Sequence, residues 1–154
     1  MKPAPTIPLT HEKFSELEAK KKFLDTEIIS TITRLQEARE QGDLSENGAY
    51  KYAKMELGNL RRQLGEVKRL LASSFVAKKS STQVGVGFGS TVTITNTTET
   101  MTYTLVSQHE SDLRAGKLSL QSPLGTALTG KKAGEQVTVT APNGQQVWQI
   151  LAVV

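Results

Sequence analysis

A seven-residue repeat of apolar positions in the first half is the feature that most constrains this chain. Between residues 50 and 71 the steps alternate between three and four without a break, at Tyr50, Ala53, Leu57, Leu60, Leu64, Val67 and Leu71. A looser run with the same spacing precedes it, at Phe14, Leu17, Leu24, Ile28, Thr31, Leu35 and Ala38, with Ile32 alongside. Such a repeat forms one stripe along an α-helix and is typical of coiled coils. The sequence therefore predicts two long helices that bury their stripes against each other.

A short polar segment, residues 41–47, separates the two runs. Gly42 is suited to ending the first helix and Asp43 to capping the second, while Thr10 is suited to capping the first. Because a short connection makes consecutive helices antiparallel neighbours, we expect a helical hairpin with residues 42–47 at its tip. Helices of about 28 residues, at roughly 1.5 Å per residue, would project on the order of 40 Å.

Two acidic residues, Asp43 and Glu46, lie three positions apart at this tip. One interpretation is a capping box, in which both side chains bind backbone N–H groups at the start of the second helix. The other is a pair of hard oxygen ligands for Mg²⁺, which usually takes one or two protein carboxylates and keeps several waters. Both interpretations stay open, and in the second a partner would have to supply the remaining ligands.

Basic residues surround the tip and continue along the second helix. Arg39, Lys51 and Lys54 flank the tip, and Arg61, Arg62, Lys68 and Arg69 follow. The simplest interpretation is a solvated face, because acidic residues are interspersed. A nucleic-acid surface would need several of these cations on one face, and Arg39 and Lys54 could form a small basic spot near the tip. A net charge of +4 permits a polyanionic partner without requiring one.

The second half has a different composition, with 10 charged residues after Ala77 against 24 before it. Alternating β-prone stretches predict half-buried antiparallel strands at residues 91–95, 101–107, 117–121, 136–140 and 147–154. Asn143-Gly144 predicts a hairpin, and Ser122-Pro123 predicts the start of a short helix. We therefore expect an α+β chain, with a helical hairpin at 1–77, a linker at 78–82 and an antiparallel β-sheet domain with one short helix at 83–154.

Several kinds of site are excluded or disfavoured. The absence of cysteine rules out disulfides, cysteine zinc sites and thiol nucleophiles. His11 and His109 stand alone, and no Lys-Ser/Thr follows the glycines at 85–89 as a phosphate loop would need. No stretch approaches the roughly 20 apolar residues of a membrane span, and no secretory signal is visible at the start. We expect a cytoplasmic protein without membrane contact and without a self-contained active site, hence not itself an enzyme.

Two separated motifs form a recognisable pair. The first is Gly42-Asp43-Leu44-Ser45-Glu46-Asn47, followed by Tyr50 and Ala53-Lys54; the second is residues 122–135, SPLGTALTGKKAGE. Together they resemble the bacterial transcript cleavage factors of the GreA/GreB family. Gly89-Ser90-Thr91-Val92 and Pro142-Asn143-Gly144 also fall where the family has them. The resemblance runs from about Leu9 to the C-terminus. The length and modest basic character are closer to the GreA branch.

The resemblance implies a coiled coil that enters the secondary channel of RNA polymerase and an FKBP-like domain that docks at the channel's rim. The implied activity is stimulation of the polymerase's own endonucleolytic cleavage of the nascent RNA 3′ end in backtracked complexes. The factor would act as a monomer and as a cofactor to the polymerase active site. The alternatives are a secondary-channel inhibitor without cleavage activity, or an FKBP-like binding or chaperone module that carries the hairpin as an adaptor arm.

The resemblance also implies roles for individual residues. Asp43 and Glu46 would help the polymerase hold a second Mg²⁺ and orient the attacking water. Arg39 and Lys54 would lie near the extruded RNA; Leu44, Ser45, Asn47 and Tyr50 would support the tip; and Ser122, Pro123, Leu124 and Gly125 would contribute to docking. Family members commonly have Ala-Glu where this chain has Gly48-Ala49. One carboxylate near the tip is thereby lost, so we expect weaker cleavage than in a typical member.

Overall fold

The computed structural model describes residues 4–42, 46–78 and 84–154. The fold is α+β, as predicted, and the chain forms two compact units. One unit comprises Met1–Thr6 with Glu12–Ser74, and the other comprises Ile7–His11 with Phe75–Val154. The predicted linker at 78–82 lies, apart from Lys78, outside the described residues.

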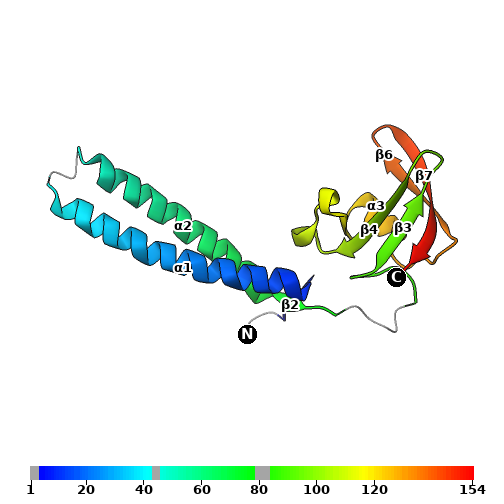
Figure 1. The fold of residues 1–154 in the computed structure, drawn as a ribbon, viewed down its shortest axis with the longest axis horizontal. Helices are drawn as coiled ribbons and strands as arrows, with labels where there is room; N and C mark the ends of the chain where they lie inside the picture. The colour runs from blue at the N-terminus through cyan, green and yellow to red at the C-terminus, as the bar shows by residue number, and fades with distance from the viewer. Residues whose placement is uncertain (1–3, 43–45, 79–83) are drawn as a thin grey trace. The chain divides into compact units, whose positions relative to one another are not determined.

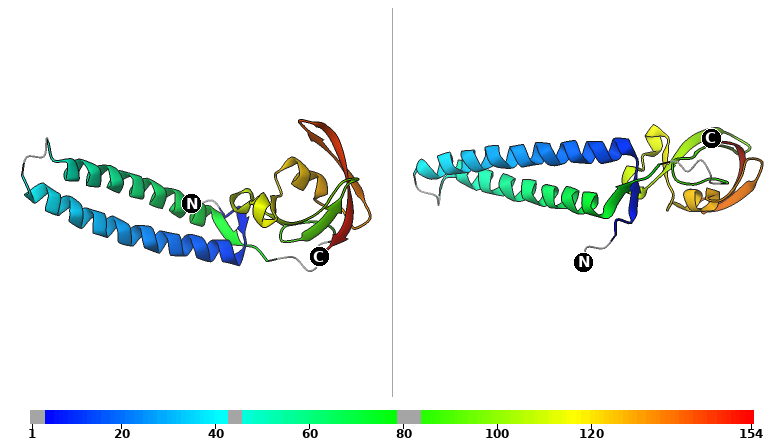
Figure 2. Two further views of the ribbon diagram at one scale, coloured as in Figure 1. Left: turned by 45° about the horizontal axis from the view of Figure 1, so that its top comes forward. Right: turned by 90° about the horizontal axis from the view of Figure 1, so that it is seen from below.

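The first unit is a hairpin of two long helices, α1 (His11–Glu40) and α2 (Gly48–Ser73), which lie side by side and antiparallel (Figures 1 and 2). Their buried residues fall on the predicted stripes: Leu17, Leu24, Thr31 and Ala38 on α1, and Ala53, Leu57, Leu64 and Val67 on α2. The heptad prediction is therefore confirmed. Burial of this apolar seam is what holds the two helices together.

A polar group inside the seam helps to fix its register. Thr31 is fully buried, and its hydroxyl oxygen accepts a hydrogen bond of 2.9 Å from Arg34. The same guanidinium group reaches across to α2, where it forms a 3.1 Å ion pair with Glu56. Thr31 thus positions the Arg34 guanidinium within α1, and sliding one helix past the other would break the ion pair that Arg34 makes with Glu56.

Two short strands beside the helix ends were not expected from the sequence. β1 (Ile7–Leu9) pairs with β2 (Ser74–Val76), and the flanking hydrogen bonds join Thr6 N to Ser73 O and Ala77 N to Leu9 O, both at 2.9 Å. Leu9 is fully buried. The segment before α1 is rich in proline and the segment after α2 is rich in serine, so neither composition indicates a strand. The two segments are also far apart in the chain, and no local pattern indicates that they pair.

The second unit contains a five-stranded sheet in the order β5-β4-β3-β7-β6. Its strands are β3 (Thr91–Thr95), β4 (Thr100–Val106), β5 (Lys117–Ser119), β6 (Gln136–Ala141) and β7 (Gly144–Val153). All five predicted strands are present, and the predicted hairpin joins β6 to β7; Gly144, expected in its turn, is the first residue of β7 and pairs with Ala141. One expectation was wrong: β5 runs parallel to β4. The connection makes this possible because it contains two 3₁₀ turns, Gln108–Glu110 and Leu113–Ala115.

The sheet curls around the predicted short helix, α3 (Pro123–Leu128), which packs on its concave face (Figure 2). Alternating side chains of the strands form the core with Leu128 of this helix: Val92, Ile94, Leu105, Leu118, Val137, Trp148 and Ile150. Trp148 is the only tryptophan of the chain. Its fluorescence therefore reports on the folding of this unit alone.

A buried carboxylate, Glu110, was missed by the sequence interpretation. Its side chain is in the 3₁₀ turn after β4 and the residue is 6% exposed. One oxygen accepts a 2.8 Å hydrogen bond from the backbone N–H of Thr10, and the other accepts a 2.6 Å bond from the Thr10 hydroxyl. These bonds compensate the cost of burying the charge and hold the segment before α1 within the second unit.

Candidate functional site

The tip of the hairpin is the main candidate site, because the predicted acidic pair, Asp43 and Glu46, belongs to it. Asp43, Leu44 and Ser45 lie outside the described residues. Glu46 is described: it is exposed, it lies just before the start of α2, and it forms no ion pair with any described residue. Its carboxylate is therefore available to a ligand from outside the chain.

Asn47, directly after Glu46, links the ends of both helices. Its side-chain oxygen accepts a 3.1 Å hydrogen bond from Tyr50 N and so caps α2. Its side-chain nitrogen donates a 2.6 Å bond to the carbonyl oxygen of Ala38, in the last turn of α1. One amide thus satisfies a free donor of one helix and an acceptor of the other. These two hydrogen bonds, which we call the Asn47 clamp, hold the backbone next to Glu46 in place.

This geometry corrects the predicted start of the second helix. The helix begins at Gly48 with Asn47 as its N-cap, so Asp43 is not the cap and the Asp43–Glu46 capping box is wrong. Asn is as good an N-cap as Asp, and several polar residues in succession left the sequence prediction ambiguous. Glu46 precedes the cap, which leaves it outside the helical hydrogen bonding of α2.

At the other side of the tip, Gly42 follows α1 with φ of +126°. An L side chain rarely adopts this conformation, so the prediction of a helix-ending glycine is confirmed. A Cβ atom at this position would meet no other atom within 4 Å. The requirement for glycine at this point is therefore one of backbone conformation, not of space.

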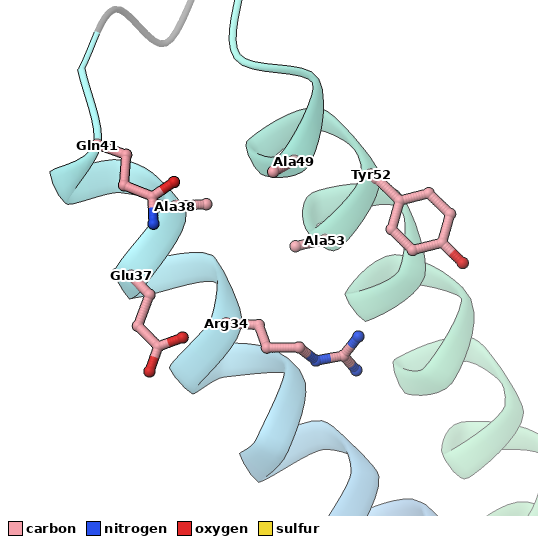
Figure 3. Close-up of a pocket in the computed structure, with 7 residues that line it drawn as sticks. All are labelled: Arg34, Glu37, Ala38, Gln41, Ala49, Tyr52 and Ala53. Carbon is pink, nitrogen blue, oxygen red and sulfur yellow. The ribbon is translucent and has the colours of Figure 1, made fainter.

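Between the helices just below the tip lies a shallow cavity of about 270 Å³ (Figure 3). Small side chains form its floor, namely Ala38 of α1 with Ala49 and Ala53 of α2. Arg34 extends across one end, and Tyr52, which is 60% exposed, lies on the other helix with its ring directed outward. The cavity exists because alanines fill little of the space between two helices at this level.

The basic residues near the tip are exposed. Arg39 is in the last turn of α1, Lys51 and Lys54 are in the first two turns of α2, and none of the three forms an ion pair with a described residue. Arg39 also complements the negative end of the α1 dipole. These exposed side chains bring positive charge to this end of the hairpin, which would attract an anionic partner.

In the second unit, the four residues of the expected docking segment surround the start of α3. Ser122 accepts a 3.0 Å hydrogen bond from Gly125 N and donates a 2.7 Å bond to the Ser119 carbonyl oxygen. Gly125 is buried, and a Cβ atom there would lie 2.0 Å from that same carbonyl oxygen. Leu124 packs partly against the core, whereas Pro123 is exposed. Pro123 is therefore the member of this set that is most available to a partner.

Other kinds of site find no support in the described part of the chain. No group of three or more His, Cys, Asp or Glu side chains is arranged there to hold a metal ion. His11 and His109 are exposed. No described helix combines the length and apolar character that a bilayer crossing requires.

Two family profiles match the chain in succession. One, described as "Transcription elongation factor, N-terminal", covers residues 7–76, and the other, "Transcription elongation factor, GreA/GreB, C-term", covers residues 81–154. The chain belongs to the GreA/GreB family. The predicted resemblance is therefore confirmed, with one profile on the hairpin sequence and one on the sheet domain.

Relatives in this family are similar over nearly the whole chain. The transcription elongation factor GreA of Thermosipho africanus is 38% identical over 150 residues, which covers 96% of both proteins. That of Caulobacter vibrioides is 38% identical over 151 residues, with the same coverage. Among solved structures, the GreA factor homolog 1 (Gfh1) protein of Thermus thermophilus matches 96% of this chain and 98% of its own, with 21% identity and a TM-score of 0.45.

Asn47 is predicted from the resemblance to support the tip of this GreA/GreB chain, and in the structure it joins the ends of the two helices. Its signal was an asparagine just before a new apolar run, which is an N-cap pattern. The second hydrogen bond, from Asn47 to Ala38 O, spans nine residues and has no pattern in the sequence. Arg34 was missed for the same reason, since its role depends on a buried threonine and on a glutamate of the other helix.

Replacing Asn47 by alanine should destabilise the hairpin by about 1–2 kcal/mol, because it removes the α2 cap and leaves the Ala38 carbonyl without this donor. Thermal unfolding followed by far-UV circular dichroism measures the loss. Asn47→Ser is the matched control, since the serine hydroxyl oxygen still accepts from Tyr50 N but the side chain is too short to reach the Ala38 carbonyl oxygen. A loss as large in Asn47→Ser as in Asn47→Ala would show that the cap itself contributes little.

Proposed function

We propose that this chain binds RNA polymerase, inserts its helical hairpin into the secondary channel and stimulates cleavage of the RNA 3′ end in backtracked complexes. The observation that carries the proposal is the exposed Glu46, unpaired among the described residues and presented beside the Asn47 clamp at the end of a two-helix arm. A hairpin that buries its own seam can project without further packing, which suits it to reach a distant site. Membership of a family of transcription elongation factors supports the same function.

The acidic pair fits a shared metal ion by its chemistry. Asp43 and Glu46 would offer only oxygen ligands, the kind that Mg²⁺ prefers, and two carboxylates are too few for a site of their own. The polymerase would supply the remaining ligands. When bound there, the ion would supply charge stabilisation and a more acidic water for phosphodiester hydrolysis, as the second ion of a two-metal site does.

The chain's own residues would then have distinct tasks. Asp43 and Glu46 would orient the attacking water, while the Asn47 clamp keeps Glu46 at a fixed place at the tip. Arg39 and Lys54 would bind phosphates of the extruded RNA. In the second unit, the exposed Pro123 and its neighbours would dock on the polymerase surface at the channel rim. The factor would act as a cytoplasmic monomer and would contribute groups to another enzyme's active site.

The direct test adds the purified protein to a backtracked elongation complex that carries end-labelled RNA. We expect short 3′ cleavage products to appear much faster than with polymerase alone. The opposite result, an unchanged cleavage rate at a concentration at which binding is demonstrated, would reject cleavage stimulation.

A second candidate is inhibition of the polymerase by occupation of the same channel. It is favoured by one specific observation: Gly48 and Ala49 begin α2, so the helix start carries no carboxylate of its own. An elongation assay on a complex that has not backtracked separates the two, since an inhibitor would slow it. An FKBP-like binding module is disfavoured because Trp148 is buried in the core of the sheet domain and exposes little surface to a peptide.

A further inference from the structure

The five-stranded sheet has two edges, and only one of them is protected against pairing with another chain. At the first edge the outermost strand, β5, is three residues long and begins with Lys117. Asp112 covers it as an isolated antiparallel bridge, in which the backbones of Asp112 and Lys117 exchange N–H···O bonds of 2.8 and 2.9 Å. A short edge strand, a lysine and a covering segment are devices by which proteins prevent edge-to-edge association.

The opposite edge, β6, has none of these devices. Its six residues, QVTVTA, include no charged residue, proline or glycine, and their register with β7 is unbroken from Gln136 to Ala141. From Gln136 to Val154 there is no charged side chain, in a chain of which 22% is charged. β6 lies at the outer edge of the sheet (Figure 1), and β7 is the only described strand that pairs with it. Such an edge is a template for a further strand.

The free backbone groups of β6 belong to alternate residues. Ile150 of β7 donates a 2.9 Å hydrogen bond to the carbonyl oxygen of Glu135, so the backbone of Glu135 and of the odd-numbered residues that follow faces β7. The N–H and C=O groups of Gln136, Thr138 and Thr140 therefore point away from the sheet. All three residues are exposed, and these groups have no hydrogen-bond partner in the described part of the chain.

We propose that two copies of this chain associate through their β6 strands, which pair antiparallel about a two-fold axis at Thr138. In this register Thr138 faces its own copy, Gln136 faces Thr140, and Val137 faces Val139. Each of the three outward-pointing residues would donate one backbone hydrogen bond and accept one. Valine meets valine on the inner face of the sheet, polar side chains meet on the outer face, and no like charges are brought together.

The self-complementarity of β6 favours a second copy over an unrelated extended peptide, which would share only the backbone bonds. Threonine pairs of this kind already occur within the sheet, where the hydroxyl oxygens of Thr93 and Thr102 are 3.2 Å apart. The association also closes at two chains. Once β6 is paired, the edge that remains in each copy is the protected β5 edge.

The dimer should be weak. One pair of six-residue strands buries much less than the roughly 800 Å² per chain of a stable interface, so we expect a dissociation constant on the order of 100 µM. At lower concentrations the chain is then a monomer, which is the state that the proposed function requires. The inference goes beyond that function, and its test needs no polymerase.

Sedimentation equilibrium of the full-length protein, from about 10 µM to about 1 mM, tests the inference. We expect the weight-average mass to rise from 16.8 kDa toward twice that value. Thr138→Lys should weaken association about tenfold or more, because equal charges would meet at the axis. Thr102→Lys is the matched control, since Thr102 is exposed on the same face but belongs to β4, inside the sheet, and it should associate like the wild type. Trp148 fluorescence checks that both variants are folded.

A pair of opposite charges locates the two-fold axis. Thr138→Glu alone should also stay monomeric, whereas an equimolar mixture of Thr138→Lys and Thr138→Glu should associate at least as tightly as the wild type. A mixture that stays monomeric, or a Thr138→Lys variant that associates like the wild type, would overturn the inference. So would a wild-type chain that is still monomeric at about 1 mM. If Thr138→Lys then weakened binding to polymerase, the β6 edge would accept a polymerase strand instead.

Discussion

Replacing Asp43 by asparagine together with Glu46 by glutamine is expected to abolish stimulated RNA cleavage, with a loss of about 100-fold or more. The substitutions keep the size and polarity of both side chains and remove only the charges that would hold a cation and orient water. Binding to polymerase should remain nearly intact, because neither residue belongs to the seam or to the docking segment. Product formation from labelled RNA in a backtracked complex gives the rate, and a competition assay gives the affinity.

The matched control for this pair is Glu40→Gln. Glu40 is the last residue of α1, is exposed, and loses the same charge near the same end of the hairpin. We expect its cleavage activity to stay within about twofold of wild type, since the charge of an exposed side chain that does not hold the cation is screened by salt. Equal losses in Glu40→Gln and in the double variant would mean that the general negative potential of the tip matters, and not the acidic pair.

Replacing Gly125 by alanine is expected to have the largest effect on stability. The added Cβ would lie 2.0 Å from the carbonyl oxygen of Ser119, which is backbone and therefore cannot simply rotate away. Relieving the clash would move α3 away from the end of β5 and would disturb the Ser122 hydrogen bonds. We expect a loss of about 3 kcal/mol or more, which corresponds to a fall of about 12 °C or more in the melting temperature of a domain of this size.

Trp148 fluorescence measures this loss in the second unit, while far-UV circular dichroism is dominated by the two long helices of the first. Gly48→Ala makes the same chemical change where nothing lies within 4 Å, and should not destabilise the protein. A Gly125→Ala variant with an unshifted fluorescence transition would show that the α3 region yields at little cost. In that case the Ser119 carbonyl oxygen would not be the reason that position 125 requires glycine.

The parts of the fold that could be predicted from the sequence depend on local patterns. The heptad spacing fixed which residues of α1 and α2 are buried, and alternation fixed the strands of the sheet. Ser122 followed by proline predicted the start of α3, and the structure has Ser122 as its N-cap. In each case the information lies within a few residues, where backbone geometry and side-chain period act directly.

The features that escaped prediction depend on contacts between distant segments. The β1–β2 pairing, the parallel β4–β5 pair and the bonds from Thr10 to Glu110 join residues whose proximity no local pattern encodes. At the site, Glu46 and Asn47 were correctly placed at the tip, but the cap was assigned to Asp43. The choice among neighbouring polar residues depended on the Ala38 carbonyl oxygen, which only the folded hairpin brings within reach.

The size of the buried side chains along the hairpin has a consequence for its mechanics. On α1 they shrink toward the tip, from Leu17 and Leu24 to Thr31 and Ala38, and Ala53 faces this end from α2. Less apolar area is buried there, so local opening should require less free energy at the tip than at the base. The base of the arm is thus held by apolar burial, whereas order near the tip depends more on the two hydrogen bonds of Asn47.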